Sequence, residues 1–244
     1  MTTSIRRRSI PLLLVTSNDE TPRLFRPLPG RTVDRSAAYR SLLLELLDLV
    51  EAERPDTDEP MWQHRARRSV GQTVKGRAEE AAPVPDEWFE PLLRAAVHEP
   101  DPSFNRQLVE PAVAAFGRRR VQLALLAYLD SDVTSDVAGA ARAWYWAQAH
   151  PTYQRGSDTP TARSVAEYEA DGDLRERYRR IALRRFVTET DLDVRRCLLP
   201  GLPLDERLYP AEMHDLVARA VRIGRTSSDD YLRHRVEIQV ARRL

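Results

Sequence analysis

Three consecutive aromatic side chains, with an arginine close by, are the residues of this sequence best suited to molecular recognition. The stretch SDVTSDVAGAARAWYWAQAH, residues 131–150, contains Arg142, Trp144, Tyr145 and Trp146. Aromatic rings and guanidinium groups bind partners by stacking, by cation–π contact and by hydrogen bonds to carboxylates or phosphates. Successive residues of a helix point about 100° apart, so the three rings cannot share one face.

The spacing of this stretch gives each ring a different expected place. Trp144 belongs to an apolar stripe at helical spacing, so we expect it to pack between helices. Tyr145 is expected to cover the flank with its hydroxyl in water. Trp146 shares a face with Arg142 and needs a cover, either the loop that follows or a partner. Trp146, Arg142 and Tyr145 are therefore candidate partner-binding residues.

A second candidate surface is a row of arginines on the helix expected over Asp173–Val187. Arg177, Arg180 and Arg184 fall on one helical face, and Glu176 can pair with Arg180. The row is either a solvated face or a surface for an anion or an acidic partner.

The sequence contains no strong catalytic motif. It has no glycine-rich phosphate loop, no paired-histidine zinc helix and no nucleophile elbow. The single cysteine, Cys197, excludes an internal disulfide and a cysteine-based zinc site. The adjacent carboxylates in residues 227–230 are expected to cap a helix. We therefore predict no catalytic residues, no metal site and no cofactor.

The elements that must position these side chains are predicted to be helices from residue 85 onward. Four places share one layout, in which an amphipathic helix, a short turn containing Asp and a second amphipathic helix follow one another. They are 86–98 with 103–116, 118–129 with 136–149, 173–187 with 191–202, and 211–223 with 229–243. A single hairpin cannot bury its apolar faces, so such hairpins must stack. We predict an all-α fold, a right-handed α-solenoid of about four stacked helical hairpins.

The remaining segments are expected to be less regular. Residues 1–35 are an extension that forms a small β-hairpin or a flexible tail, and residues 36–84 hold one helix, to about residue 53, and then a linker with a short helical piece. Residues 85–244 form the repeat domain, in which Asp136 is expected to cap the Trp-rich helix. Residues 151–172 are expected to be a long loop, of a length that is typical of either a functional or a disordered segment.

Three segments carry a family resemblance. LLAYLDSDVTSDVAGAARAW, RRFVTETDLDVRRCLLPGL and AVRIGRTSSDDYLRHRVEIQVA resemble HEAT-type repeats, with Asp193-Val194-Arg195 the best match to the opening of the second helix. The resemblance covers about residues 85–244. It implies a curved α-solenoid with a surface that binds protein or nucleic acid.

Composition limits the function further. The 244 residues carry a net charge of +1, so no global basic field points to nucleic acid. Lys75 is the only lysine, which favours codon bias in a GC-rich bacterial genome over the alternative, selection of arginine for bidentate contacts to carboxylates or phosphates. No apolar run is long enough to span a membrane, and we expect a cytoplasmic protein with no membrane partner.

These observations favour a non-enzymatic scaffold that binds a protein or peptide on its concave face. The first alternative is a nucleic-acid-binding protein, because HEAT-like alkylpurine DNA glycosylases resemble this chain in architecture. The second is a small-molecule enzyme or lyase on an α-solenoid, favoured only by the 151–172 loop.

Overall fold

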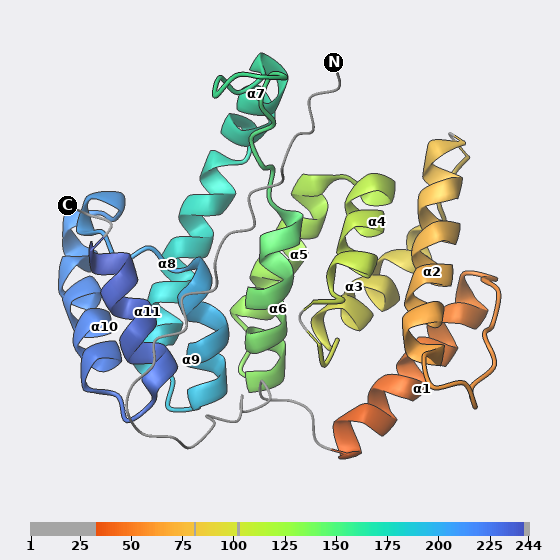
Figure 1. Cartoon of the computed structure of the whole chain (residues 1–244), viewed down its shortest axis with the longest axis horizontal. Helices are drawn as coiled ribbons and strands as arrows, with labels where there is room; N and C mark the ends of the chain where they lie inside the picture. The colour runs from red at the N-terminus through yellow and green to blue at the C-terminus, as the bar shows by residue number, and fades with distance from the viewer. Residues whose placement is uncertain (1–32, 81, 102, 242–244) are drawn as a thin grey trace, which may run out of the picture.

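The computed structural model describes residues 33–80, 82–101 and 103–241, and the regular secondary structure of these residues is helical (Figure 1). Within them there is no named strand, and the nearest approach to one is an isolated antiparallel bridge between Tyr153 and Pro160. The all-α prediction is confirmed. The expected N-terminal β-hairpin lies outside the described residues.

The described α-helices are these, in chain order: α1 (Val33–Leu49), α2 (Trp62–Glu79), α3 (Phe89–Val97), α4 (Arg106–Phe116), α5 (Arg118–Leu129), α6 (Thr134–Ala147), α7 (Ala162–Ala170), α8 (Gly172–Thr188), α9 (Leu192–Leu198), α10 (His214–Thr226) and α11 (Asp230–Ala241). Short 3-10 helices precede α3 and α10 and follow α9, over Asp86–Trp88, Ala211–Met213 and Leu199–Gly201, and a further one spans Glu206–Leu208.

Helices occupy both halves of each predicted hairpin, as α3 with α4, α5 with α6, α8 with α9 and α10 with α11. Each hairpin also packs on the one before it. Along one layer α2 contacts α4, α4 contacts α6, α6 contacts α9 and α9 contacts α11, while in the other layer α5 contacts α8 and α8 contacts α10. Figure 1 shows the resulting order across the molecule, from α1 and α2 at one side to α10 and α11 at the other.

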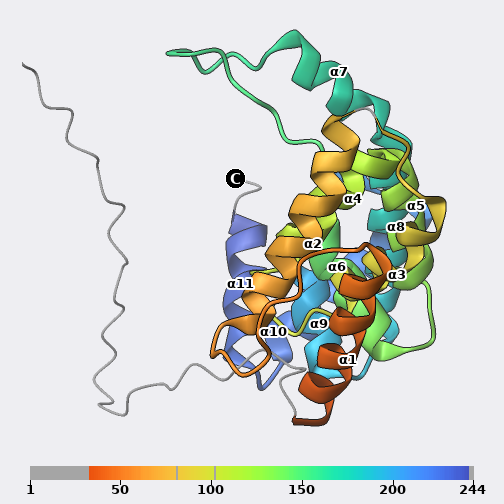
Figure 2. The same ribbon diagram turned by 90° about the vertical axis from the view of Figure 1, so that its right-hand side faces the viewer.

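Two segments expected to be irregular are helical. The expected linker contains α2, an 18-residue helix that packs on α4. Gly71 lowers the helix propensity of this segment, but it allows these two helices to approach closely, because an added Cβ would lie 2.6 Å from the Gln107 carbonyl oxygen. The expected loop over residues 151–172 contains α7, which Thr161 caps by accepting a hydrogen bond from the Ser164 amide. Figure 2 shows α7 at one edge of the molecule, at the opposite end from α1.

One continuous apolar core runs through the stack, from Tyr39 in α1 to Val236 in α11. Trp144 lies in it with 2% of its surface exposed, as predicted. Its ring stacks on Tyr178 of α8, with 4.5 Å between ring centroids and 10° between planes. This stack joins the second predicted hairpin to the third.

A buried polar cluster fixes α1 and α2 against the turn between α3 and α4. The Arg67 guanidinium donates two hydrogen bonds to the Glu99 carboxylate, from Nε at 2.5 Å and from Nη2 at 3.0 Å. The Tyr39 hydroxyl donates to the same carboxylate, and so does the Asp101 backbone N–H, at 2.9 Å. Both charges are thus fully paired inside the core, as a buried ion pair requires.

Candidate binding groove

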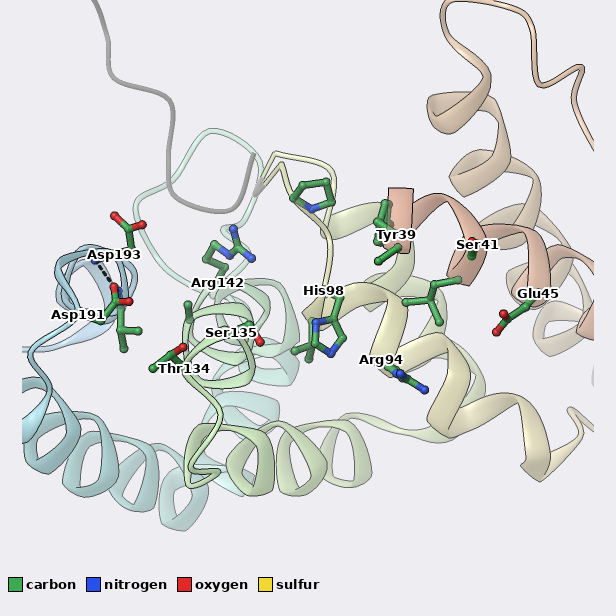
Figure 3. Close-up of a pocket in the computed structure, with 16 residues that line it drawn as sticks. Tyr39, Ser41, Glu45, Arg94, His98, Thr134, Ser135, Arg142, Asp191 and Asp193 are labelled. Atoms are coloured by element: carbon green, nitrogen blue, oxygen red, sulfur yellow. Dashed lines mark hydrogen bonds between the residues drawn. The ribbon is translucent and has the colours of Figure 1, made fainter. Parts of the chain in front are cut away.

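Four helices from different parts of the chain enclose a groove with a cavity of about 340 Å³ (Figure 3). The side chains that line it come from α1, α3, α6 and α9 and from the turns next to α3 and α9. Its polar and charged members are Tyr39, Ser41, Glu45, Arg94, His98, Thr134, Ser135, Arg142, Asp191 and Asp193.

Helix α6 forms the middle of the groove wall. Thr134, Ala138 and Arg142 line the groove at four-residue intervals, so they lie above one another on one helical face. The small side chain of Ala138 leaves the space between the other two open. Because α6 begins at Thr134, its first turn faces the groove and adds the partial positive charge of a helix N-terminus.

Several charged groups around the groove are already engaged within the protein. His98 lies 3.4 Å from the carboxylate of Asp136, measured from Nε2 to Oδ1. Asp191 caps α9, accepting hydrogen bonds from the backbone amides of the residues two and three positions later, at 2.7 and 3.2 Å. Asp193 lies 3.9 Å from the guanidinium of Arg196. The prediction that Asp136 caps α6 is wrong, because the helix begins at Thr134: the N-cap position is Val133, and Asp136 lies within the first turn, where its carboxylate accepts a hydrogen bond from the Ser131 hydroxyl.

Arg142 differs from these groups. Among the residues that the structure describes, it forms no ion pair, and its Nε is shielded from solvent without a hydrogen-bond partner. Arg94 and Glu45, at the α1 side of the groove, also form no ion pair with another described residue. A buried guanidinium donor without an acceptor carries a desolvation cost that a ligand oxygen would remove.

The aromatic candidates lie farther along α6. Tyr145 is exposed over 56% of its surface, as expected, and its ring contacts that of Trp146 edge-on at 4.8 Å between centroids. Trp146 is half-buried, and the Arg106 guanidinium of α4 lies 5.3 Å from its ring centroid. The cation–π contact of Trp146 therefore comes from α4.

The arginine row on α8 is a separate surface. Arg177 and Arg184 are exposed, and Arg180 is half-buried and forms an ion pair with Glu176. None of the three lines the groove. Of the six predicted binding residues, the structure places Arg142 in the groove, Tyr145 and Trp146 together one turn farther on, and the remaining three on another element.

The groove residues that sequence reasoning missed are mostly on α1, α3 and α9. Arg94, His98 and Glu45 stand at ordinary positions of amphipathic helices, and no local motif marks them. Their common feature is that successive helices bring them to one groove, which periodicity within one helix does not reveal. Only the Asp-containing turns could have indicated groove residues from the sequence, because Asp191 and Asp193 lie at such a turn and line the groove.

The groove has polar donors and acceptors for binding a ligand. No group of three or more His, Cys, Asp or Glu side chains suited to a metal ion occurs among the described residues. None of the helices in the described ranges is long and apolar enough to cross a membrane. No protein-family model matches the chain, and no curated protein or solved structure matches it.

Proposed function

We propose that this protein is a non-enzymatic scaffold, a HEAT-like α-solenoid that holds a peptide segment of a partner protein in the groove between α1, α3, α6 and α9. The observation that carries this proposal is the groove itself: four helices that are distant in sequence contribute polar side chains to one open cavity of about 340 Å³. Helical arrays characteristically bind extended partners along such a surface.

The chemistry of the lining supports peptide binding. It combines guanidinium, hydroxyl and carboxylate groups with the apolar side chains of Leu42, Val97 and Val194. A peptide presents amide groups, charged ends and apolar side chains at short intervals, and a mixed lining can satisfy all three. The repeat architecture and the concave binding face are part of this proposal, and so is a cytoplasmic location.

Filling the groove tests the proposal. Ala138 is half-buried at the centre of the groove wall, so Ala138→Phe places a ring where a peptide would lie. We would select binders from a displayed library of random 12-residue peptides on the full chain, and then measure each binder by fluorescence anisotropy. We expect a recurrent set of peptides whose affinity falls by about tenfold or more in Ala138→Phe, which corresponds to the loss of one good contact.

The matched control is Ala166→Phe, on an exposed face of α7. It adds the same ring outside the groove and should leave every affinity unchanged, while thermal melts of both variants verify folding. The proposal fails when no peptide is enriched above background, or when the enriched peptides bind Ala138→Phe as tightly as the original protein.

Nucleic-acid binding is the competing function, and the charge arrangement speaks against it. Duplex binding draws on a basic footprint, whereas the net charge is +1 and many arginines are paired with carboxylates. A salt-dependent gel shift on duplex and single-stranded DNA distinguishes the two functions. Binding at low salt that persists in Ala138→Phe would favour nucleic acid over the peptide groove.

A further inference from the structure

We infer that residues 23–28 of this chain occupy the groove between α1, α3, α6 and α9 and compete there with peptides of a partner. This inference rests on the proposed scaffold function and adds self-inhibition to it. Three features identify the occupant: the place where the N-terminal chain enters the structure, the charge that it carries, and the groove carboxylates that it meets.

The first feature is the point at which the N-terminal chain meets the groove. The described structure begins at Val33, the first residue of α1, and the α1 residues that line the groove begin at Ala38, five positions later. Four residues separate Leu28 from Val33, and an extended chain over that interval spans up to about 17 Å. Residues 23–28 are therefore tethered next to the α1 wall of the groove, which gives them a high effective concentration there.

The second feature is a division of charge along the sequence. Residues 1–32 contain six arginines and two carboxylates, a net charge of +4, whereas the whole chain carries +1. Residues 33–244 therefore carry −3. The occupant that we infer, Arg-Leu-Phe-Arg-Pro-Leu over residues 23–28, contains two of the arginines and no carboxylate. The groove lining has three carboxylates and two guanidinium groups, so a basic segment complements its charge.

The third feature is a pair of carboxylates at the two ends of the groove. Glu45 of α1 and Asp191 of α9 are both exposed, and neither forms an ion pair with another described residue (Figure 3). Both backbone amides that Asp191 caps donate to its Oδ1, so its Oδ2 can accept from a ligand. The third carboxylate, that of Asp193, lies beside Arg196 and is left out of the argument.

The order of the arginines in the segment fits these two ends. Because the segment is tethered through α1, its later residues lie nearer to α1 and its earlier residues lie nearer to α9. Arg26 is thus assigned to Glu45, and Arg23, three positions earlier, to Asp191. A guanidinium and a carboxylate form charge-assisted hydrogen bonds, which fix the register of the segment in the groove.

The apolar residues and prolines of the segment suit the rest of the lining. Its two leucines and one phenylalanine can contact Leu42, Val97 and Val194, which line the groove. The sequence Arg-Pro-Leu-Pro over residues 26–29 favours an extended backbone, whose carbonyl groups are open to hydrogen-bond donors. The two guanidinium groups of the lining can donate to these carbonyls, so they accept a basic segment without an acidic partner.

Disulfide trapping in the full chain tests where the segment binds. Leu24→Cys places a thiol in the segment, and Ala138→Cys places one on the α6 wall of the groove. The native Cys197 is buried, which raises the pKa of its thiol and keeps it unreactive. We expect an intramolecular disulfide to form about tenfold faster or more in this pair than in Leu24→Cys with Ala166→Cys, on an exposed face of α7.

Charge reversal provides a second measurement of the same contact. Glu45→Arg should slow trapping by about threefold or more, because it replaces attraction at the α1 end of the groove by repulsion. Adding Arg26→Glu should restore the rate, and a general loss of folding would not be restored in this way. Glu87→Arg changes an exposed carboxylate outside the groove and should leave the rate unchanged.

Competition measures the consequence for binding. A segment that fills the groove nine-tenths of the time weakens a competing peptide about tenfold. For a peptide selected on the groove, the full chain with Arg23→Glu and Arg26→Glu should therefore bind about tenfold more tightly than the original protein. The matched control is Arg6→Glu with Arg7→Glu, which makes the same change of charge outside the segment and should leave the affinity unchanged.

Three outcomes would overturn the inference. Equal trapping rates at Ala138 and Ala166 would show that the segment does not prefer the groove. Faster trapping from Leu12→Cys than from Leu24→Cys would assign the groove to the earlier apolar run of the N-terminal chain. Disulfide-linked dimers in place of the intramolecular product would assign it to a second copy of this chain.

The trapping and the peptide selection also separate this inference from the scaffold function. Selected peptides that require an open groove, without preferential trapping at Ala138, would leave the scaffold function intact and remove self-inhibition. Preferential trapping at Ala138 without any enriched peptide would support the docked segment and remove the scaffold function.

Discussion

The pair between Asp229 and Arg196 shows how one side chain can serve two purposes at the residue scale. Asp229 accepts a hydrogen bond from the Leu232 backbone N–H at 2.9 Å, which caps α11, and also forms an ion pair with Arg196 of α9. Its side chain is only 9% exposed. Burial alone would raise the pKa of Asp229. The hydrogen bonds from Arg196 and from the Leu232 amide together have a larger, opposite effect, so the pKa lies below its ordinary value.

This arrangement predicts an acid-sensitive contribution to stability. A carboxyl group whose pKa is lower in the folded state stabilises the fold above its unfolded pKa, about 3.9, and loses that effect as the pH falls through the folded pKa. Asp229→Asn keeps a capping side chain but removes the charge. We expect it to lower the free energy of unfolding by about 1–3 kcal/mol at pH 7, and by progressively less below about pH 4.

Urea unfolding of both proteins between pH 2.5 and 7 would measure this difference. Asp158→Asn, in an exposed turn before α7, is the control and should change stability little at any pH. A difference for Asp229→Asn that stays constant over the whole pH range would show that the ionised pair is not its source.

Individual side chains could be predicted where helical periodicity decides their surroundings. The burial of Trp144, the exposure of Tyr145 and the capping role of residues 227–230 all follow from position on a helix, and the structure confirms them. The cation–π contact of Trp146 was not predictable in this way. It comes from Arg106, which is 40 positions earlier and carries no local signal.

At the scale of elements, glycine reveals where two helices approach most closely. An added Cβ on Gly139 of α6 would lie 2.0 Å from the Val97 carbonyl oxygen of α3. The backbone of α3 would have to move to accept it. Gly76 of α2 is also in a helix but has free space beside it, because no atom lies within 4 Å of an added Cβ there.

The two glycines therefore predict opposite effects of the same substitution. Gly139→Ala should destabilise the protein by about 1–3 kcal/mol or more, because the clash is with backbone rather than with a flexible side chain. Gly76→Ala should stabilise it by about 0.5–1 kcal/mol through the higher helix propensity of alanine. Chemical denaturation of both variants checks this, and equal effects of the same sign would contradict the close α3–α6 contact.

Helix positions were largely predictable, and the exceptions have physical causes. The four hairpins have strong apolar periodicity, and helices occur where it predicts them. Helix α2 was missed as a full helix because its glycines lower intrinsic propensity, while Ala66, Val70 and Val74 stabilise it by packing on the core. Helix α7 was not predicted because the turn-forming residues just before it, Gly156 to Pro160, favoured a loop over the whole segment.

At the scale of the whole molecule, the groove could not be predicted because it depends on how hairpins stack. Sequence periodicity places the apolar face of each helix, but the groove requires α1, α3, α6 and α9 to align at one side of the stack. That alignment depends on crossing angles and turn lengths, which several packing classes allow. Arg142 was identified for its type and face, whereas its neighbours in the groove became apparent only with the assembled structure.

The order of contacts along the stack makes a last prediction about the whole chain. The main contacts of α1 are with α2 and α3, and those of α11 are with α9 and α10, besides the short helix after α9. When each unit contacts only its neighbours, stability is roughly the sum of local terms, and a defect should act locally.

Leu43 of α1 and Leu232 of α11 are both completely buried and provide a matched pair for Leu→Ala substitution. Each change should cost about 2–5 kcal/mol. We expect hydrogen exchange in Leu232→Ala to accelerate in α9, α10 and α11 and to stay unchanged in α1, α2 and α4, with the reverse pattern in Leu43→Ala. Uniform acceleration along the whole chain in both variants would instead show that the continuous core unfolds as one unit.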